Sequence, residues 1–394
     1  MLLSISLILL MSLSLYAIFV RIRIPGLIAF IITGIVLGPF ILNLIDPNIL
    51  AISADLREIA LIVILLRAGL SLDLNDLKKV GRPAIFLSFL PATIEILFIG
   101  FISPLLFEIT LLEGFMLGSI VAAVSPAVVV PRMISFIEKK IGTDKQIPQM
   151  ILAGSSIDDI FAIVIFTICL QIYQTNSFSA LTVILFPISL VVSLIVGIII
   201  GLGLIKIFKW LHIRDTLKVL IIFAVSFLLI ALQDLVDEFF TFSGLLAVIA
   251  LGGAILKQYP VLAKRLTSKF SKIWVVSEIM LFVLVGAVVD IAIFGEVGLF
   301  AVILVLAAIL MRMLGVILSV TKTNLNFKEK VFTCFSYIPK ATVQAAIGAI
   351  PLSMGVPAGN LILTISVLAI FISAPIGAIF MDSFNKKLLT HESA

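Results

Sequence analysis

Residues 151–170 read ILAGSSIDDIFAIVIFTICL, an apolar run interrupted by two adjacent aspartates, Asp158 and Asp159. A carboxylate in hydrocarbon is energetically unfavourable, so its presence in an apolar segment long enough to cross a bilayer predicts a functional or paired group. Composition supports a membrane setting, because 62% of the 394 residues are hydrophobic and only 12% are charged. Such values are typical of a polytopic membrane protein and exclude a large water-soluble domain.

Windows of about 20 apolar residues, the length that crosses the hydrocarbon core, predict an all-α polytopic membrane protein with about 13 transmembrane helices. The first window lacks the basic start and the small-residue cleavage site of a signal peptide, so we interpret it as a retained helix with its N-terminus outside. The expected spans are 1–19, 26–45, 56–72, 83–107, 113–133, 147–172, 179–206, 217–233, 239–256, 271–289, 297–320, 331–351 and 358–381.

Lysine and arginine alternate strongly between successive loops. The loops that follow the odd-numbered spans, with the span ends beside them, hold 23 of the 27 basic residues, whereas the opposite loops hold only Arg57. Cytoplasmic loops carry such an excess, so we expect a multi-pass protein of the plasma (inner) membrane with a cytoplasmic C-terminus. The net charge of +5 is then a topology signal, and no nucleic-acid partner is expected. The basic segment 257–272 is expected along the inner surface, where anionic lipid is a candidate partner.

Ionisable residues in four spans are predicted near the middle of the bilayer, from the rise of about 1.5 Å per helical residue. They are Glu95, Arg312, Lys340 and the aspartate pair. Because arginine does not deprotonate, Arg312 is a fixed counter-charge, and we expect a structural ion pair with Glu95. A purely structural network is the alternative for Asp158 and Asp159, but such a network would need only one acid for each base.

Proline interrupts two spans at matching depth. Pro126 and Pro131 lie in span 113–133, and Pro339, followed by Lys340, lies in span 331–351. Proline removes an amide donor and clashes with the preceding turn, so both helices are expected to open and expose carbonyls that line a cavity. A single proline can be only a kink. The two spans run in opposite directions, which predicts two inverted six-helix repeats with crossed discontinuous helices and an ion site at the crossing.

Adjacent helical residues point about 100° apart, so the two aspartates cannot share one site equally. A hard cation such as Na⁺ needs several oxygen ligands, which one carboxylate, hydroxyl groups, freed carbonyls and water can supply. Such hydroxyls often bond their own backbone instead. A carboxylate that holds either a proton or a cation, but not both, gives obligatory antiport without a chemical step. Candidate supplementary ligands are Ser125, Ser155, Ser156 and Thr342.

Three segments, AVSPAVVVP, GSSIDDI and YIPKATVQAAIG, with the weaker LLRAGLSLD, together resemble the signatures of the monovalent cation/proton antiporters. The similarity is greatest to the double-aspartate branch of NapA-like and animal NHA-type sodium/proton exchangers, and it covers nearly the whole chain. It implies an NhaA/NapA-like fold, a homodimer, and Asp159 as cation ligand and proton carrier with Asp158 as its partner. Lys340 would steady the helix crossing. Many electrogenic relatives have lysine at the place of Arg312, so the resemblance implies electroneutral exchange.

The same resemblance implies a division of the chain into functional segments. These are 1–82 and 211–290 as a scaffold that dimerises, 83–172 and 291–382 as a mobile core that carries the ions, 173–210 as a linking helix, and 383–394 as a cytoplasmic tail.

The expected activity is therefore exchange of Na⁺ or Li⁺ for H⁺ across the membrane. No cofactor, no enzymatic step and no metal site beyond the transported cation at Asp159 are predicted. A sodium-coupled symporter of bile-acid-transporter-like fold is the main alternative, since it shares the crossed helices but does not need paired aspartates. A cation channel would need long filter loops, and an intramembrane aspartyl protease would need GxGD near one aspartate; the sequence contains neither.

Overall fold

The apolar segments form helices, and every regular element of the described residues in this computed structural model is an α-helix. The structure describes residues 1–394 except 23, 72–80, 176–179, 212, 237–241 and 391–394. In lipid, backbone N–H and C=O groups must bond within their own segment, which favours helices. The helices are α1 (Leu2–Arg21), α2 (Leu27–Leu37), α3 (Pro47–Ala51), α4 (Ser53–Ser71), α6 (Arg82–Leu87), α7 (Leu90–Phe107), α8 (Leu111–Ala122), α9 (Pro126–Glu138), α10 (Ile147–Thr175), α11 (Ala180–Leu211), α12 (Asp215–Val236), α13 (Gly244–Gln258), α14 (Pro260–Ala287), α15 (Ile291–Ser319), α16 (Phe327–Ser336), α17 (Thr342–Ile347), α18 (Ile350–Ser353) and α19 (Gly359–Leu388).

Nine helical segments of the described residues are long and apolar enough to cross a membrane. Shorter apolar helices add to them at Leu27–Leu37, Gly244–Gln258 and Thr342–Ser353. The predicted all-α, multi-pass architecture is thus confirmed, whereas the number of 13 spans and the inverted repeats stay predictions. The nine segments are Leu2–Arg21, Arg82–Phe107, Leu111–Glu138, Ile147–Gln174, Val191–Leu211, Asp215–Gln233, Pro260–Ala287, Gly298–Ser319 and Gly359–Leu388.

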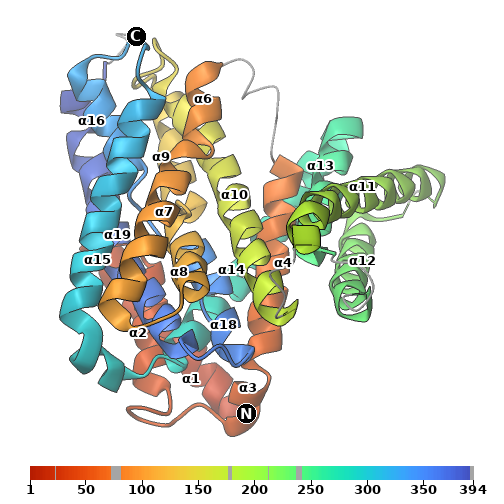
Figure 1. The fold of residues 1–394 in the computed structure, drawn as a ribbon. Helices are drawn as coiled ribbons and strands as arrows, with labels where there is room; N and C mark the ends of the chain where they lie inside the picture. The colour runs from red at the N-terminus through yellow and green to blue at the C-terminus, as the bar shows by residue number, and fades with distance from the viewer. Residues whose placement is uncertain (23, 72–80, 176–179, 212, 237–241, 391–394) are drawn as a thin grey trace. The chain divides into compact units, whose positions relative to one another are not determined.

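Two compact units make up the chain. Unit 1 comprises Met1–Arg57, Leu74–Cys169 and Ile279–Ala394, and unit 2 comprises Glu58–Asp73 and Leu170–Glu278. In unit 1, α7 packs against α8 and α15, and α19 packs against α15 and α16, as Figure 1 shows. The five ionisable residues that the sequence predicts near the midplane all belong to unit 1.

Glycine allows α7 to lie very close to two of its neighbours. A Cβ atom at Gly118 of α8 would meet the Ile96 carbonyl, and one at Gly315 of α15 would meet the Pro91 backbone. Backbones that approach this closely are typical of helix packing in membranes, where small residues line the interfaces. These contacts hold α7, α8 and α15 together. Glu95, which lies on α7, is fully buried.

Polar contacts join α9, α16, α19 and the loop before α10 at one end of unit 1. Lys145 donates to both carboxylate oxygens of Glu329, at 3.0 and 2.9 Å. Arg132 forms two bonds to Asp382, at 2.9 and 2.8 Å. Near the C-terminus of the described chain, the Thr390 carbonyl accepts a bond of 2.8 Å from the Gly142 N–H.

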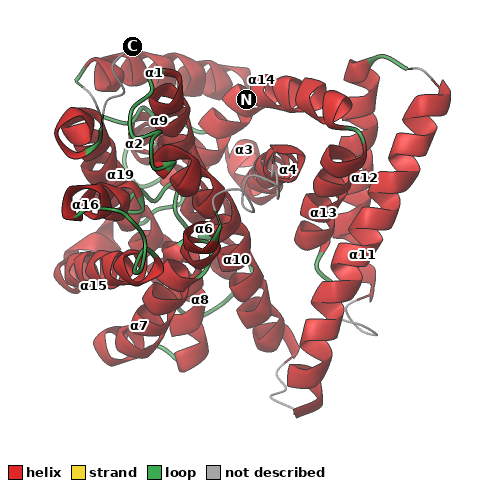
Figure 2. Ribbon diagram, turned by 90° about the horizontal axis from the view of Figure 1, so that it is seen from above, coloured by secondary structure: helices red, strands yellow, loops and turns green. Residues whose placement is uncertain are grey.

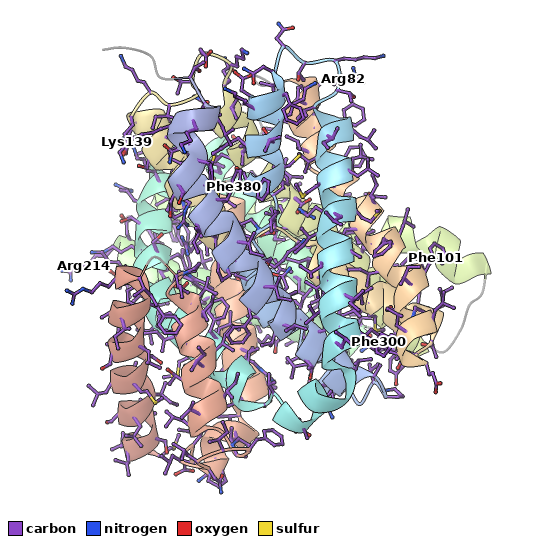
Figure 3. The ribbon with its side chains drawn as sticks, turned by 90° about the vertical axis from the view of Figure 1, so that its left-hand side faces the viewer. Arg82, Phe101, Lys139, Arg214, Phe300 and Phe380 are labelled. Carbon is purple, nitrogen blue, oxygen red and sulfur yellow. The ribbon has the colours of Figure 1, made fainter. Side chains whose placement is uncertain are left out.

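The two ends of unit 1 differ in their side chains. Figure 3 places Arg82, at the start of α6, and Lys139, just after α9, toward the same end of unit 1, whereas Phe300 of α15 lies toward the opposite end. Figure 1 marks the C-terminus at the end where α16 begins. The two labelled basic residues of unit 1, Arg82 and Lys139, thus lie toward the end that holds the C-terminus.

Glu113 connects two helix starts at the other end of unit 1. Its Oε2 accepts bonds from the Thr110 N–H at 2.8 Å and the Thr110 hydroxyl at 2.7 Å, which completes a capping box at the start of α8. Its Oε1 accepts a bond of 3.0 Å from the N–H of Ala358, the N-cap residue of α19. One buried carboxylate therefore satisfies donors at the N-termini of both α8 and α19.

We expect Glu113→Ala to lower the free energy of unfolding by about 2 kcal/mol, because it leaves two helix starts without their acceptor. Thermal unfolding of the detergent-solubilised protein measures this. Glu138→Ala is the matched control, since Glu138 is exposed and its side chain forms no hydrogen bond within the described part of the chain. Equal stability of the two variants would contradict the assigned capping role.

Unit 2 is built mainly from α11, α12 and α13, which lie side by side in Figure 2. A Cβ atom at Gly197 of α11 would clash with the Ala247 carbonyl of α13, so the two helices pack backbone to backbone. The guanidinium carbon of Arg67 lies 5.6 Å from the centre of the Trp274 ring. Arg67 belongs to the LLRAGLSLD segment, whose last two residues lie outside the described ones.

Candidate functional site

The helix predicted at 113–133 is broken in the middle. Helix α8 ends at Ala122, the backbone is extended at Ala123 and Ser125, and Pro126 occupies the first turn of α9. Proline suits that position because a first-turn N–H has no helical partner anyway. The break leaves the last carbonyls of α8 without partners in their own helix.

Pro131 does not take part in this break. It lies inside α9, which continues through it to Glu138, so the structure corrects the expectation that both prolines open the helix. At the sixth position of the helix, proline removes only one helical hydrogen bond. The remaining bonds of α9 keep the helix continuous.

The helix predicted at 331–351 is also broken, between Ser336 of α16 and Thr342 of α17, and Pro339 lies in the break. The two breaks touch directly, because the Ser125 N–H donates a bond of 2.7 Å to the Pro339 carbonyl. The Lys340 N–H donates to the Ser373 hydroxyl of α19 at 2.9 Å. A pair of crossed discontinuous helices, hydrogen-bonded at the crossing, is therefore present in unit 1.

Arg312 of α15 reaches this crossing and is fully buried. Its Nη1 donates to Glu95 Oε2 at 2.9 Å, and its Nη2 donates to Asp158 Oδ2 at 2.6 Å. Nη1 also donates to the Ala122 carbonyl, and Nε donates to the Tyr337 carbonyl at 2.7 Å. One guanidinium thus joins α7, α10 and both helix breaks.

Lys340 adds a second buried cation beside Arg312. Its Nζ donates to Glu95 Oε2 at 2.6 Å and to the Ala122 carbonyl at 3.1 Å. Both cations therefore also bond a carbonyl at the C-terminus of α8, the negative end of that helix. With Glu95 and Asp158 ionised, these four side chains form a network with no net charge.

Asp159 stands apart from this neutral network. Asp158 is fully buried and also accepts a bond of 3.0 Å from the Val124 N–H, next to the α8–α9 break. Asp159 is 8% exposed, and its Oδ1 has no hydrogen-bond partner within the described residues. Its carboxylate forms no ion pair there either, so Asp159 is the charge in this region that remains without a counter-charge.

The hydroxyl groups predicted as supplementary ligands fall into two pairs. Those of Ser155 and Ser156 donate to the carbonyl of Leu152 in their own helix, at 3.3 and 2.8 Å. Those of Ser125 and Thr342 are buried, and among the described residues they have no hydrogen-bond partner. Ser125 and Thr342 flank the two breaks. Of the four predicted hydroxyl ligands, theirs are therefore the ones whose oxygen atoms are free to bind a cation.

Two features of this site were missed by the sequence reasoning. Arg312 was assigned to Glu95 alone, but it also binds Asp158, which no spacing along the chain could indicate. The sequence predicts no role for Gln344 of α17, whose Nε2 donates to three carbonyls of the α8 C-terminus. The signal that could have found Gln344 is an amide side chain four residues after Lys340, in a segment of mostly small and apolar residues.

Comparison with known proteins finds relatives that are sodium/hydrogen exchangers by name, among them one from Homo sapiens and one from Mus musculus. The chain is 33% identical to sodium/hydrogen exchanger 9B2 of Homo sapiens over 354 residues, which covers 86% of this chain and 64% of that protein. It is 34% identical to sodium/hydrogen exchanger 9B1 of Mus musculus over 346 residues, 86% of this chain and 61% of the relative. The chain spans less than two thirds of the length of these relatives.

Among solved structures, the sodium proton antiporter MjNhaP1 from Methanocaldococcus jannaschii at pH 8 has the same fold. The TM-score is 0.81 at 22% sequence identity, and the match covers 97% of each chain. The profile of the family described as "Sodium/hydrogen exchanger, transmembrane" matches residues 6–382. These matches confirm the resemblance drawn from the sequence motifs, and the chain belongs to the sodium/hydrogen exchanger family.

Proposed function

We propose that this protein exchanges a monovalent cation, Na⁺ or Li⁺, for H⁺ across the membrane by alternating access, and that both ions use Asp159. The observation that supports this most directly is the unbalanced charge of Asp159 beside a neutral four-residue network at the helix crossing. The names of the similar relatives, which are sodium/hydrogen exchangers, support the choice of ions.

Competition for one carboxylate accounts for the coupling. An ionised Asp159 without a counter-ion is unfavourable in the low-dielectric interior, and either a proton or a cation removes that penalty. The two loaded forms are therefore the ones that pass through the membrane, while the empty form does not. Asp158 acts as the partner of Asp159, because its bonds to Arg312 and Val124 hold it in place at the adjacent helical position.

The oxygen atoms near the crossing suit a hard cation. Na⁺ and Li⁺ favour oxygen ligands such as carboxylates, carbonyls and hydroxyls. The Asp159 carboxylate would provide the charge, and the hydroxyls of Ser125 and Thr342 would add neutral ligands together with water. Ser155 and Ser156 remain candidates only through the lone pairs that their bonds to Leu152 leave free.

Exchange is proposed to be electroneutral, with one proton for one cation. Arg312 keeps its charge and holds Asp158 and Glu95 in ion pairs, so these groups carry no second proton. We therefore expect the initial exchange rate in proteoliposomes to stay within about twofold when a potential of either sign is imposed with K⁺ and valinomycin. A clear acceleration by the potential, about 2.3 kcal/mol per charge per 100 mV, would contradict a one-to-one exchange.

The remaining organisation is proposed on the same basis. The four residues of the network lie in segments 83–172 and 291–382, which supports these segments as the mobile core, with 1–82 and 211–290 as the dimerising scaffold and 173–210 as the linking helix. Arg82 and Lys139, which lie toward the end that holds the C-terminus, support a cytoplasmic C-terminus in the plasma (inner) membrane, with the N-terminus outside. Anionic lipid would meet the basic segment 257–272. Residues 176–179 of the linking helix and 391–394 of the tail lie outside the described residues.

The direct test is a cation panel. The purified protein, reconstituted in liposomes, should dissipate a pH gradient when Na⁺ or Li⁺ is added, and the rate should depend on pH. Choline chloride of equal ionic strength is the control. A rate that is the same with choline as with Na⁺, Li⁺ and K⁺ would exclude the proposed exchange.

A further inference from the structure

The broken end of α8 exposes four carbonyls in the interior of unit 1. These belong to residues 120–123, which the break at Ala123 to Ser125 leaves without N–H groups from a following turn. A carbonyl without a donor in a dry interior costs about 1–3 kcal/mol. The fold must therefore supply hydrogen-bond donors to these four carbonyls.

Donors of two different kinds meet this requirement. The Ala122 carbonyl accepts from Arg312 and Lys340, whose charges Glu95 and Asp158 already match. The other three carbonyls share the two N–H groups of one side-chain amide, that of Gln344, which is fully buried. Its Nε2 lies 2.9 Å from the Ile120 oxygen, 3.1 Å from the Val121 oxygen and 2.9 Å from the Ala123 oxygen.

Gln344 is also close to the aspartate pair. The peptide group between Ala123 and Val124 accepts from Gln344 through its oxygen and donates to Asp158 Oδ2 through its N–H, at 3.0 Å. One peptide unit thus separates the amide from the carboxylate, which places them within about 8 Å of each other. A charge on residue 344 would act strongly on Asp158 and on the adjacent Asp159 in this low-dielectric surrounding.

We propose that Gln344 is a positioning residue that caps α8 without adding charge, and that its neutrality determines how tightly the site binds a cation. A basic residue would serve the negative end of a helix well, yet a third cation here would balance Asp159 and remove the need for a transported one. Glutamine supplies the donor and leaves the single negative charge uncompensated. The inference rests on the proposed function, because it assigns the origin of the site's net charge.

Two substitutions separate the cap from the charge. Gln344→Lys keeps a donor and adds a positive charge, while Gln344→Met has a similar length and has neither. Each variant is measured in two ways. Thermal unfolding of the full-length protein, with and without Li⁺ or Na⁺, reports stability and cation binding. Exchange in proteoliposomes, recorded against cation concentration and pH, reports transport.

The Lys variant should remain folded, with an apparent cation affinity at least about tenfold lower and a pH profile shifted about one unit toward acid, since one unit corresponds to a tenfold change. The Met variant should unfold at a lower temperature, while its apparent cation affinity stays within about threefold of the wild type. If the Lys variant does not fold, Gln344→Glu is measured instead, because it adds a negative charge. Its apparent cation affinity should rise, and its pH profile of exchange should shift toward alkali.

Two results would overturn the inference. One is a folded Lys variant with the cation affinity and pH profile of the wild type. If the Lys variant does not fold, the same result in the Glu variant would overturn the inference. The other is a Met variant as stable as the wild type, which would mean that the three bonds do not cap α8. Failure of the proposed function gives a different pattern, because then the wild-type protein itself shows neither exchange nor stabilisation by Li⁺ or Na⁺.

Discussion

Asp159→Asn should reduce cation-dependent proton exchange by at least about a hundredfold while the protein remains folded. Asparagine has nearly the same shape as aspartate but cannot carry the charge that a buried cation needs. Removing the partner of a buried charge costs about 3 kcal/mol or more, and about 1.4 kcal/mol corresponds to a factor of ten. The fold should be unaffected, because the side chain of Asp159 forms no hydrogen bond or ion pair within the described residues.

Everted membrane vesicles give the measurement. Respiration acidifies the vesicle interior, and the recovery of a pH-sensitive dye after addition of NaCl or LiCl reports the exchange. Asp55→Asn is the matched control, because it makes the same chemical change at an exposed carboxylate and should leave exchange intact. A wild-type rate in the Asp159→Asn variant, at equal protein level, would rule out Asp159 as the shared site.

Arg312→Met should lower the free energy of unfolding by about 3–5 kcal/mol, the usual effect of removing one partner from a buried ion pair. The substitution leaves Asp158 without its strongest partner and leaves Glu95 with Lys340 alone. It also removes donors from the carbonyls of Ala122 and Tyr337. Both helix breaks should therefore loosen together.

Thermal unfolding in detergent measures this effect, and Arg132→Met is the matched control. Arg132 also forms two hydrogen bonds to an aspartate, but that aspartate, Asp382, is 39% exposed at the end of the unit. Exposed ion pairs contribute only about 0–1 kcal/mol. Arg312→Lys keeps the charge balance with fewer donors and should fall between the two. The assigned role of Arg312 would be wrong if Arg312→Met were no less stable than Arg132→Met.

Much of the fold could be predicted because the bilayer imposes simple rules on the sequence. Apolar runs of spanning length predicted the helices, and Pro126 and Pro339 predicted the two breaks that the structure contains. Both rules are local, since a helix bonds within itself and proline acts on its own turn. The same locality explains the error at Pro131, where the neighbouring bonds of α9 outweigh one missing donor.

The partners of the buried charges could not be predicted in the same way. Spacing along a helix indicates depth in the membrane and relative direction around the axis, but not which neighbouring helix each side chain faces. Glu95 and Arg312 lie 217 positions apart and Asp158 and Arg312 lie 154 apart, so only the packing of α7, α10 and α15 brings them together. The three bonds of Gln344 to α8 depend on the crossing of two breaks that are equally remote in the chain.

The sequence by itself determined that this is a helical membrane protein and that two of its helices break at a proline, and it predicted that a pair of carboxylates lies beside these breaks. These properties follow from hydrophobicity and from proline, which act over a few residues. Only the tertiary structure decided that Asp158 is neutralised by Arg312 and that Asp159 is not. The physical reason is that electrostatic balance depends on distances between groups brought together from remote helices.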